Sequence, residues 1–559
     1  MHLSHKNTWL RSPTPDRVDR MIFGYVSDQN YVALSGVAAE CVHAETREAT
    51  EVRSSPSGAL RAELARGVYL IVLSKEGFGA KWGVYQIGQG EPLQFRLLSD
   101  TPMGFMWPKW VRAGEPAEIK VHAAEQYRLS LWRYGLRKEP YGVLSWFDEH
   151  GPQAMRQILP DEDFSQSGVR WNTTGYPSPH PQQSMSAPVR SGLYYIWGQT
   201  LMGKRFSFPW VVAPAAPREK IAVLANTNTW NVYNAFGGRS NYINPTGLPA
   251  TPTINARQDL GRYIKNESVW LAKDTEFKPL SFERPELGND IFDNTPWDDL
   301  DASAPIQGRM QCGQAPGEWR LLAWLEQEGF AYDYYADAQL HDGTLNLSTY
   351  AVLLVGVHPE YWSCEMYDRV ERWVKDGGHL MYLGGNGVNC EVRFSRDGAL
   401  HCLSHEDLND NTITGNESRM HRTHKAESAL LGVAFTNTGA MTSAPYQVKQ
   451  ASHWIFSGTG LKDGDQFGRK SLHERVPGGA SGHETDKLMP SSPTCDLLAK
   501  GMNSEDGGAD LVLLSLGKGR VFSTGSITWV SSLFPDQQVS RITRNVLEAF
   551  LKVEDRLAN

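Results

Sequence analysis

The stretch Tyr350-Ala-Val-Leu-Leu-Val-Gly-Val-His-Pro-Glu-Tyr-Trp-Ser363 decides the expected fold class of the C-terminal part of the chain. It begins with a continuous apolar run, 350–355, without polar alternation, which is typical of a strand buried on both faces. Apolar residues at helical spacing follow over 366–374, and the pattern stops at Gly377-Gly378, as at the end of a helix. A second apolar run, 379–383, comes next, so the order strand, helix, strand predicts a parallel sheet.

The second half of this stretch carries polar groups at the point where the predicted strand ends. His358, Glu360 and Tyr361 follow the apolar run, and open α/β sheets place their ligand sites at the carboxyl ends of parallel strands. Packing alone does not explain polar, metal-capable side chains in this position. We therefore expect the functional site at this edge of the sheet.

Length and composition limit what the chain can do. At 559 residues it is too long for one hydrophobic core, so two or three domains are expected. A net charge of −8 argues against nucleic acid or an anionic membrane as the main partner.

The six cysteines show no C-x-x-C pair and no zinc spacing, which predicts free thiols. The sequence has no secretory signal and no membrane-length apolar run, so a cytoplasmic protein is expected.

The periodicity of the sequence changes near residue 215. Before it, short strands separated by Gly, Ser and Pro turns predict two β-sandwich-like units, 1–100 and 101–214. The expected linker is Ala213-Pro-Ala-Ala-Pro-Arg218. After it, residues 215–559 alternate strands and helices, which predicts a doubly wound α/β domain similar to glutamine-amidotransferase-like folds. The predicted chain is multidomain, with an all-β region followed by an α/β domain.

Two long irregular inserts, about 234–316 and 395–500, interrupt the α/β pattern and are too long to be passive connections. The first predicted strand of the domain, 221–224, runs into a polar and aromatic loop, 226–242, at the same sheet edge as His358. Hydrogen bonding within turns is the simpler explanation for most side chains of this loop. Two such loops at one edge nevertheless favour a site, and we expect the inserts to help build it.

Several segments resemble the catalytic large subunit of N,N-dimethylformamidase. The resemblance rests on His358-Pro-Glu-Tyr-Trp-Ser363 and Met381-Tyr-Leu-Gly-Gly-Asn-Gly387, and more weakly on 322–326, 432–435 and 525–529. It covers about residues 215–559. It implies that the chain cleaves the C–N bond of small N-substituted amides, such as N,N-dimethylformamide, to an acid and an amine. It also implies a mononuclear, non-haem ferric iron held by two tyrosines and a glutamate.

The resemblance points to Tyr361, in the tyrosine position of the first motif, as one iron ligand, and phenolate and carboxylate oxygens suit trivalent iron. Tyr233, on the loop after the first strand, is the second expected ligand. If the family's other tyrosine aligns with the start of the next helix, this chain has Glu318-Trp319-Arg320 there, and Glu318 or water would complete the shell. Glu417 is the expected carboxylate ligand, with Glu427 as its competitor.

Three residues have expected catalytic roles. His358 would transfer a proton to the leaving amine, because the ordinary pKa of histidine suits this at neutral pH; a hydrogen bond that shapes the His-Pro turn is the alternative. Glu360 would act as general base or support the metal ligands. Asn386 would bind the carbonyl oxygen or the oxyanion, unless 384–387 is an ordinary turn.

Other chemistries find less support in the sequence. Cys364 lies inside a predicted helix and not at a G-x-C-x-G or G-x-S-x-G elbow, which argues against a covalent nucleophile. No GxxxxGK[ST] loop is present, so nucleotide binding has no support. The alternative from a different class is a non-catalytic protein that binds carbohydrate or another ligand through its Trp-rich β region. For the enzyme, the resemblance adds a small accessory subunit and an oligomeric assembly as expectations.

Overall fold

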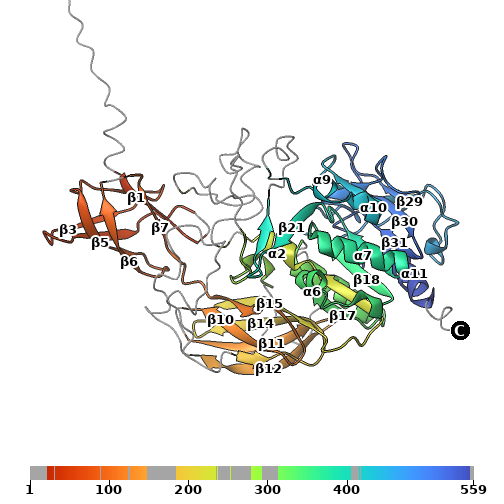
Figure 1. Ribbon diagram of the computed structural model, residues 1–559, viewed down its shortest axis with the longest axis horizontal. Helices are drawn as coiled ribbons and strands as arrows, with labels where there is room; N and C mark the ends of the chain where they lie inside the picture. The colour runs from red at the N-terminus through yellow and green to blue at the C-terminus, as the bar shows by residue number, and fades with distance from the viewer. Residues whose placement is uncertain are drawn as a thin grey trace, which may run out of the picture.

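Figure 1 shows a computed structural model of the chain, which describes residues 22–29, 32–88, 90–123, 126–147, 184–234, 236, 252, 279–291, 313–403, 415 and 417–553. Strands far outnumber helices in these ranges and fall into three consecutive sets along the chain. The prediction of a β-rich, multidomain chain is therefore confirmed. Within the same ranges, no helix is long and apolar enough to cross a membrane.

The first set of strands forms two small sheets around one core. Along β5, Tyr69, Ile71 and Leu73 are buried while Val68 and Leu70 are exposed, the alternation of a strand with one face on the core. The sheets have the orders β4-β1-β7 and β3-β2-β5-β6. Their bounds are β1 (Ile22–Ser27), β2 (Ala38–His43), β3 (Ala49–Arg53), β4 (Ala59–Arg61), β5 (Gly67–Ser74), β6 (Lys81–Ile87) and β7 (Leu93–Arg96).

The second set forms a three-stranded sheet, β13-β10-β8, and a five-stranded sheet, β12-β11-β14-β15-β9. Their inner faces share a core that includes Ile119, Leu131 and Trp210. The short strands that the sequence predicts in this region are present. The bounds are β8 (Met103–Trp107), β9 (Trp110–Arg112), β10 (Pro116–His122), β11 (Tyr127–Tyr134), β12 (Lys138–Phe147), β13 (Ser184–Ser186), β14 (Gly192–Thr200) and β15 (Arg205–Ala213).

The third set builds a nine-stranded sheet in the order β17-β16-β18-β20-β31-β30-β29-β25-β26. The part from β17 to β31 is parallel, as the sequence predicts. Its bounds are β16 (Ile221–Ala225), β17 (Asp333–Ala336), β18 (Val352–Val357), β20 (His379–Gly384), β25 (Tyr446–Val448), β26 (Gln466–Phe467), β29 (Cys495–Gly501), β30 (Asp510–Leu516) and β31 (Gly519–Ser523).

Shorter elements surround this sheet. The helices and turns are α2 (Thr227–Val232), η3 (Leu287–Asn289), α5 (Ala315–Gln327), α6 (Asp337–Asp342), η4 (Leu347–Thr349), α7 (Cys364–Asp376), α9 (Met420–Thr423), α10 (Glu427–Leu431), η5 (Trp454–Phe456), η6 (Val530–Ser532) and α11 (Gln537–Val553). Small sheets pair β19 (Tyr361–Trp362), β21 (Cys390–Phe394) and β22 (Leu400–Cys402), then β23 (Ala434–Thr436) with β28 (Thr485–Lys487), and β24 (Ser443–Ala444) with β27 (Ser481–Gly482).

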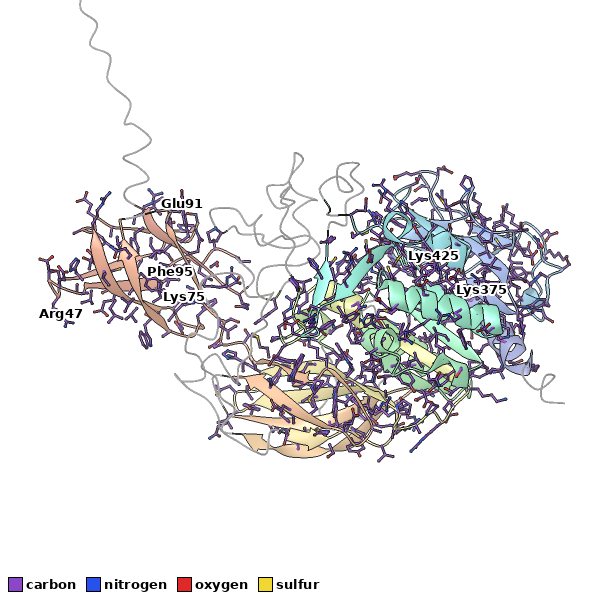
Figure 2. The ribbon with its side chains drawn as sticks, viewed as in Figure 1. Arg47, Lys75, Glu91, Phe95, Lys375 and Lys425 are labelled. Atoms are coloured by element: carbon purple, nitrogen blue, oxygen red, sulfur yellow. The ribbon has the colours of Figure 1, made fainter. Side chains whose placement is uncertain are left out.

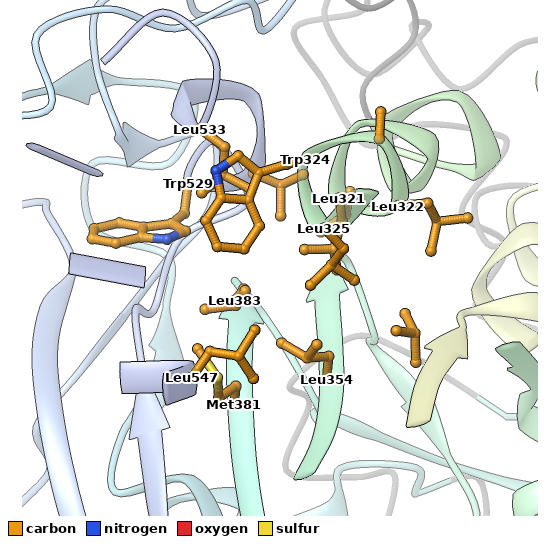
Figure 3. Packing of buried hydrophobic residues seen from close by; sticks show 14 of the residues in the cluster. Leu321, Leu322, Trp324, Leu325, Leu354, Met381, Leu383, Trp529, Leu533 and Leu547 are labelled. Carbon is orange, nitrogen blue, oxygen red and sulfur yellow. The ribbon is translucent and has the colours of Figure 1, made fainter. Parts of the chain in front are cut away.

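Both faces of β18 are covered, which explains its unbroken apolar sequence. On one face, Leu354 packs with side chains of α5 and α11, among them Leu321 and Leu547 (Figure 3). On the other face, Leu353 and Val355 pack with α7. The outer side of α7 is polar, where Lys375 and Lys425 both bind Glu371 at 2.8 Å (Figure 2). The sequence predicts this burial correctly.

The other half of the sheet corrects the prediction of a doubly wound, glutamine-amidotransferase-like domain, which is not supported. β30, β29, β25 and β26 are antiparallel to their neighbours. β29, β30 and β31 follow one another along the chain as hairpins, and hairpins reverse strand direction without a crossover helix. β25 and β26 lie within the predicted insert 395–500, whose irregular sequence hides them.

The second set of strands and the C-terminal sheet share one hydrophobic core. Tyr134 stacks edge-on against Trp319 with ring centroids 4.7 Å apart, and the Trp319 indole donates to the Gly135 carbonyl at 2.7 Å. An Arg133–Glu326 ion pair of 2.6 Å, between largely buried side chains, crosses the same contact. The contact thus couples the two parts on either side of the exposed segment 215–218.

We predict that cleavage within 215–218 leaves the two fragments associated, because the shared core and the ion pair stay intact. Size-exclusion chromatography of the nicked protein should give one peak containing both fragments. Glu326→Ala leaves the largely buried Arg133 charge without this carboxylate. The free energy that holds the two fragments together should fall by up to about 3–5 kcal/mol, so the fragments should separate. The matched control is Glu139→Ala, which removes an exposed partner of Arg133 and should change little. Separation of the unmodified nicked protein would contradict this account.

Candidate functional site

Two loops meet where the order of the parallel strands reverses. β17 lies on one side of β16 and β18 on the other, and ligands bind in parallel sheets at the carboxyl ends beside such a point. Asn226 Nδ2 donates to the Gly356 carbonyl at 2.7 Å, and Asn228 Nδ2 donates to the Tyr361 carbonyl at 3.1 Å. The predicted convergence of the loops after β16 and β18 is confirmed.

The structure corrects one detail of the first loop. Residues 227–232 form the short helix α2, where the sequence predicts a turn-rich loop. Its buried polar side chains hydrogen-bond to neighbouring loops, so the many Asn and Thr residues obscure the helical pattern. The sequence also predicts a tight turn at Gly237-Gly238 within this loop, and these two residues lie outside the described residues.

A cluster of phenol and carboxylate groups forms at this junction. Tyr233, at the C-terminal end of α2, donates its hydroxyl hydrogen to Glu360 Oε2 at 2.7 Å. The rings of Tyr233 and Tyr361 have centroids 6.2 Å apart. Tyr361 is fully buried and Glu360 is 4% exposed. Three oxygen-bearing side chains singled out in the sequence are therefore brought together.

His358 lies beside this cluster between two carboxylates. Its Nε2 is 3.2 Å from Glu360 Oε2 and 3.1 Å from Glu484 Oε2. Burial by itself would lower the pKa of His358, but the two carboxylates outweigh it and raise the pKa well above the usual value. Burial would likewise raise the pKa of Glu484, while His358 holds it below its usual range. The pair therefore favours an imidazolium next to a carboxylate.

Asn386 completes the group from the loop after β20. Its Nδ2 donates to Glu484 Oε2 at 2.8 Å, and its Oδ1 accepts from Asn389 Nδ2 at 2.5 Å. Asn389 thus fixes which end of the Asn386 amide faces Glu484. The structure brings four of the predicted site residues, Tyr233, His358, Glu360 and Tyr361, into contact, and joins Asn386 to them through Glu484.

Glu484 is a residue of this group that the sequence does not predict. It lies in the insert 395–500, directly before β28, and about a hundred residues separate it from Asn386 in the chain. The only local signal is the segment His483-Glu-Thr-Asp486, in which two acids stand two residues apart. In a strand such residues lie on the same face. The general expectation that the inserts help build the site is consistent with this placement.

The backbone near His358 is strained. Val357 has a φ of 64°, a left-handed conformation that is unfavourable for a β-branched residue, and such strain is found most often at functional sites. The Val357 carbonyl accepts from Gly385 N at 3.1 Å. A Cβ on Gly385 would overlap the Glu484 carbonyl oxygen, so this glycine allows the β18, β20 and β28 loops to approach closely.

Arg284, from the insert 234–316, holds the end of α2. It is fully buried, and all five of its N–H donors have acceptors. These acceptors are the carbonyl oxygens of Ser281, Asn231, Asn234 and Phe236 and the side-chain oxygen of Asn231. Tyr233 lies between Asn231 and Asn234, so the guanidinium fixes the turn from which its phenol reaches Glu360.

The remaining carboxylate candidates have other hydrogen-bond partners. Glu417 accepts from Arg419 N at 2.8 Å and from Arg422 Nη1 at 3.0 Å. Glu427 lies 3.8 Å from His421 Nδ1, and burial raises its pKa to about 7. Glu318 accepts from the Trp230 indole at 2.8 Å and from the Tyr334 hydroxyl at 3.0 Å. Of the carboxylates considered in the sequence, Glu360 is the one hydrogen-bonded to Tyr233.

Five of the six cysteines are described, and all five are free thiols, as predicted; Cys312 lies outside the described residues. Burial and the nearby Glu391 raise the pKa of Cys364 to about 12. A thiol with such a pKa is a poor nucleophile at neutral pH. This agrees with the absence of a nucleophile elbow in the sequence.

Comparison with known proteins adds an independent result. A family model described as N,N-dimethylformamidase beta subunit-like, C-terminal, matches residues 147–540. The N,N-dimethylformamidase beta subunits of Paracoccus aminophilus and Alcaligenes sp. are 29% and 28% identical to this chain over 296 residues. Each match covers 44% of this chain and 38% of the relative's length. A solved exo-beta-1,4-mannosidase from Opitutaceae bacterium strain TAV5 is 14% identical, covering 43% of this chain and 32% of that chain; its TM-score of 0.24 is too low to support any conclusion.

The pH dependence of the free energy of unfolding tests whether Glu318 is a structural residue. Burial raises its pKa to about 7, against 4.5 for an ordinary glutamate, so the folded state binds its proton more tightly. The associated stability is present below pH 4.5 and is lost as the pH rises through 7, with a change on the order of 3 kcal/mol. Glu318→Gln removes this titration, and urea unfolding should show the variant gaining stability relative to wild type between pH 5 and pH 8. A stability difference that does not change with pH would contradict this.

Proposed function

The chain belongs to the N,N-dimethylformamidase beta subunit-like family, and from this premise we propose that it is an amide hydrolase. The proposed reaction is hydrolysis of the C–N bond of a small N-substituted amide, such as N,N-dimethylformamide, to an acid and an amine. The observation that carries the proposal is the placement of the Tyr233–Glu360–Tyr361 cluster directly beside His358, Glu484 and Asn386. The carbohydrate-binding alternative has no observation in its favour.

The donor chemistry of the cluster fits the proposed iron. Tyr233, Tyr361 and Glu360 would supply two phenolate oxygens and one carboxylate, hard donors that suit a trivalent ion. A bound ferric ion would supply Lewis-acid chemistry at the amide carbonyl. Glu417 stays a predicted ligand, but its contacts with Arg422 and the Arg419 backbone lead us to prefer Glu360. Glu318 is part of a buried hydrogen-bond network, so the proposal does not assign it to the metal.

His358 and Glu484 supply the proton transfer that hydrolysis needs. Water adds to the carbonyl carbon, the C–N bond breaks, and one proton of the water must reach the departing nitrogen. Glu484 Oε2 and His358 Nε2 lie 3.1 Å apart, so a proton accepted by this pair can be passed to the nitrogen. The imidazolium that the carboxylates favour is the donor form that a poor amine leaving group requires.

Asn386 has a hydrogen available for the substrate. One Nδ2 hydrogen points to Glu484, and Asn389 holds the opposite end of the amide. The second Nδ2 hydrogen can be donated to the carbonyl oxygen, where negative charge develops in the transition state. Because the amide is held at both ends, little reorganisation accompanies the reaction.

The surroundings of the tyrosines favour a substrate with apolar N-substituents. Tyr361 and Tyr233 belong to a small cluster in which Trp107, Trp110 and Phe394 are the other partly buried aromatic residues. Trp107 and Trp110 come from the second set of strands, so that region would contribute to the site. Aromatic surroundings accommodate N-methyl groups better than they accommodate charged N-substituents.

The matched relatives are named beta subunits, and we propose that this chain also works in an assembly with an accessory subunit. We also propose that the protein is oligomeric and located in the cytoplasm. Recovery of a second, smaller polypeptide with the tagged chain purified from its native cells would support the assembly, and recovery of the chain alone would contradict it.

Tyr361→Phe should abolish iron binding while the fold survives, because the substitution keeps the buried ring and removes only the donor oxygen. Metal analysis and the visible tyrosinate-to-iron absorption of purified protein are the measurements. Tyr367→Phe is the matched control, since Tyr367 is also fully buried and its hydroxyl binds the Ala426 carbonyl at 2.8 Å. It should keep one iron per chain. Full iron content in the Tyr361 variant would contradict the proposal.

His358→Ala should reduce kcat by about 10²–10⁴-fold, the usual contribution of a positioned proton donor. Release of dimethylamine from N,N-dimethylformamide measures it. Cys364→Ala is the control and should leave turnover nearly unchanged, because burial keeps that thiol protonated. An inactive cysteine variant, or an acyl-enzyme trapped and seen by mass spectrometry, would overturn the mechanism.

A further inference from the structure

We infer that Asp486 is a positioning residue for Asn386: its carboxylate holds the backbone of the loop 384–388 so that the Asn386 amide faces the site. The inference rests on the proposed function in that Asn386 is taken to contact the substrate. Asp486 does not itself reach the reacting group, and its contacts are with the loop.

The contacts form a closed network around the loop. Asp486 Oδ1 accepts from the backbone N of Asn386 at 2.8 Å, and Oδ2 accepts from the Tyr382 hydroxyl at 2.6 Å. The Tyr382 oxygen in turn accepts from the backbone N of Gly387 at 2.8 Å. Asp486 and Tyr382 are each 1% exposed. Two successive amides of the loop are therefore bound, directly or through one phenol, to a single buried carboxylate.

The loop needs such support because its backbone is unfavourable. Asn386 has a φ of 49° and Val388 a φ of 56°, both in the left-handed region. Asparagine tolerates this conformation better than most residues, but valine does not. Both oxygens of Asp486 accept hydrogen bonds, one from Asn386 N and one from the Tyr382 hydroxyl, so Asp486 can hold a conformation that the sequence alone does not favour.

Glu484 and Asp486 hold the same residue from one segment. They stand two residues apart at β28, and a strand directs such residues to one face. Glu484 binds the Asn386 side chain, and Asp486 binds the Asn386 backbone. A register shift of the segment by one residue would break both contacts, so the spacing of the two acids sets the direction of the amide.

The ionisation of Asp486 supports this assignment. Burial is the largest influence and raises the pKa of Asp486 to about 7, although the hydrogen bonds from Tyr382 and Asn386 oppose it. An apolar residue would fill the space without the free-energy cost of burying a carboxylate. Perturbed carboxyl groups of this kind gather at functional sites more often than elsewhere.

The test compares Asp486→Asn and Tyr382→Phe with Asp510→Asn. Asp510 is a matched control because it is also a buried carboxylate, 4% exposed, and accepts from the backbone N of Leu488 at 2.9 Å without touching the loop 384–388. Each variant is examined as the full chain for kcat, KM, thermal midpoint and hydrogen exchange of the peptide 384–388 by mass spectrometry.

Asp486→Asn should lower kcat by roughly 10²-fold with little change in KM, because an oxyanion donor acts mainly in the transition state. Amide exchange in 384–388 should speed up in Asp486→Asn and Tyr382→Phe and stay slow in Asp510→Asn. The exchange measurement does not depend on turnover, so it decides the positioning role even if the wild type hydrolyses no amide. Equal kcat losses in the Asp486 and Asp510 variants, or unchanged exchange in 384–388, would overturn the inference.

Discussion

The close approach of the Tyr233 phenol oxygen to the Glu360 carboxylate, 2.7 Å in the structure, is the contact on which the site depends. It joins the end of α2 to the loop after β18, and the same carboxylate oxygen lies 3.2 Å from His358. Three features of the surrounding structure hold these two loops together. The strand order places them side by side, Arg284 fixes the end of α2, and the left-handed Val357 turns the chain toward Glu360. If either loop moved, the phenols, the carboxylate and the histidine would separate.

The parallel half of the sheet could be predicted because its strands are buried on both faces. β18 and β20 are unbroken apolar runs, and α7 between them has a regular helical pattern ended by Gly377. In the antiparallel half, β25 and β26 could not be predicted, since they contain only a few residues each and lie in a polar insert. Short strands owe their existence to the neighbours they pair with, and this information is absent from a local window of sequence.

The residues around the site also fall into two groups, those that the sequence predicts and those that it does not. The placement of His358, Glu360, Tyr361 and Asn386 at this edge of the sheet could be predicted because they follow strands that the apolar pattern marks clearly. Glu484 and Asp486 could not, because long-range pairing alone brings β28 to the loop after β20. For Glu417 the sequence offered a carboxylate in a polar insert, but it could not reveal that Arg422 lies 3.0 Å from it. Acidic residues in inserts are therefore assigned safely only after their partners are known.

The tyrosines of the site also belong to a second hydrophobic cluster to which the β region contributes. Trp107 and Trp110, from the second set of strands, pack against the same hydrophobic cluster as the tyrosines, so movement between the two parts would change the packing around the site. The central claim is that Tyr233, Tyr361 and Glu360 hold one iron ion. The most direct test is a crystal structure of the iron-loaded protein with anomalous data collected at the iron absorption edge. A single peak within about 2 Å of oxygens from all three side chains is the predicted result. A peak at Glu417 or Glu318, or none in a fully active crystal, would contradict it.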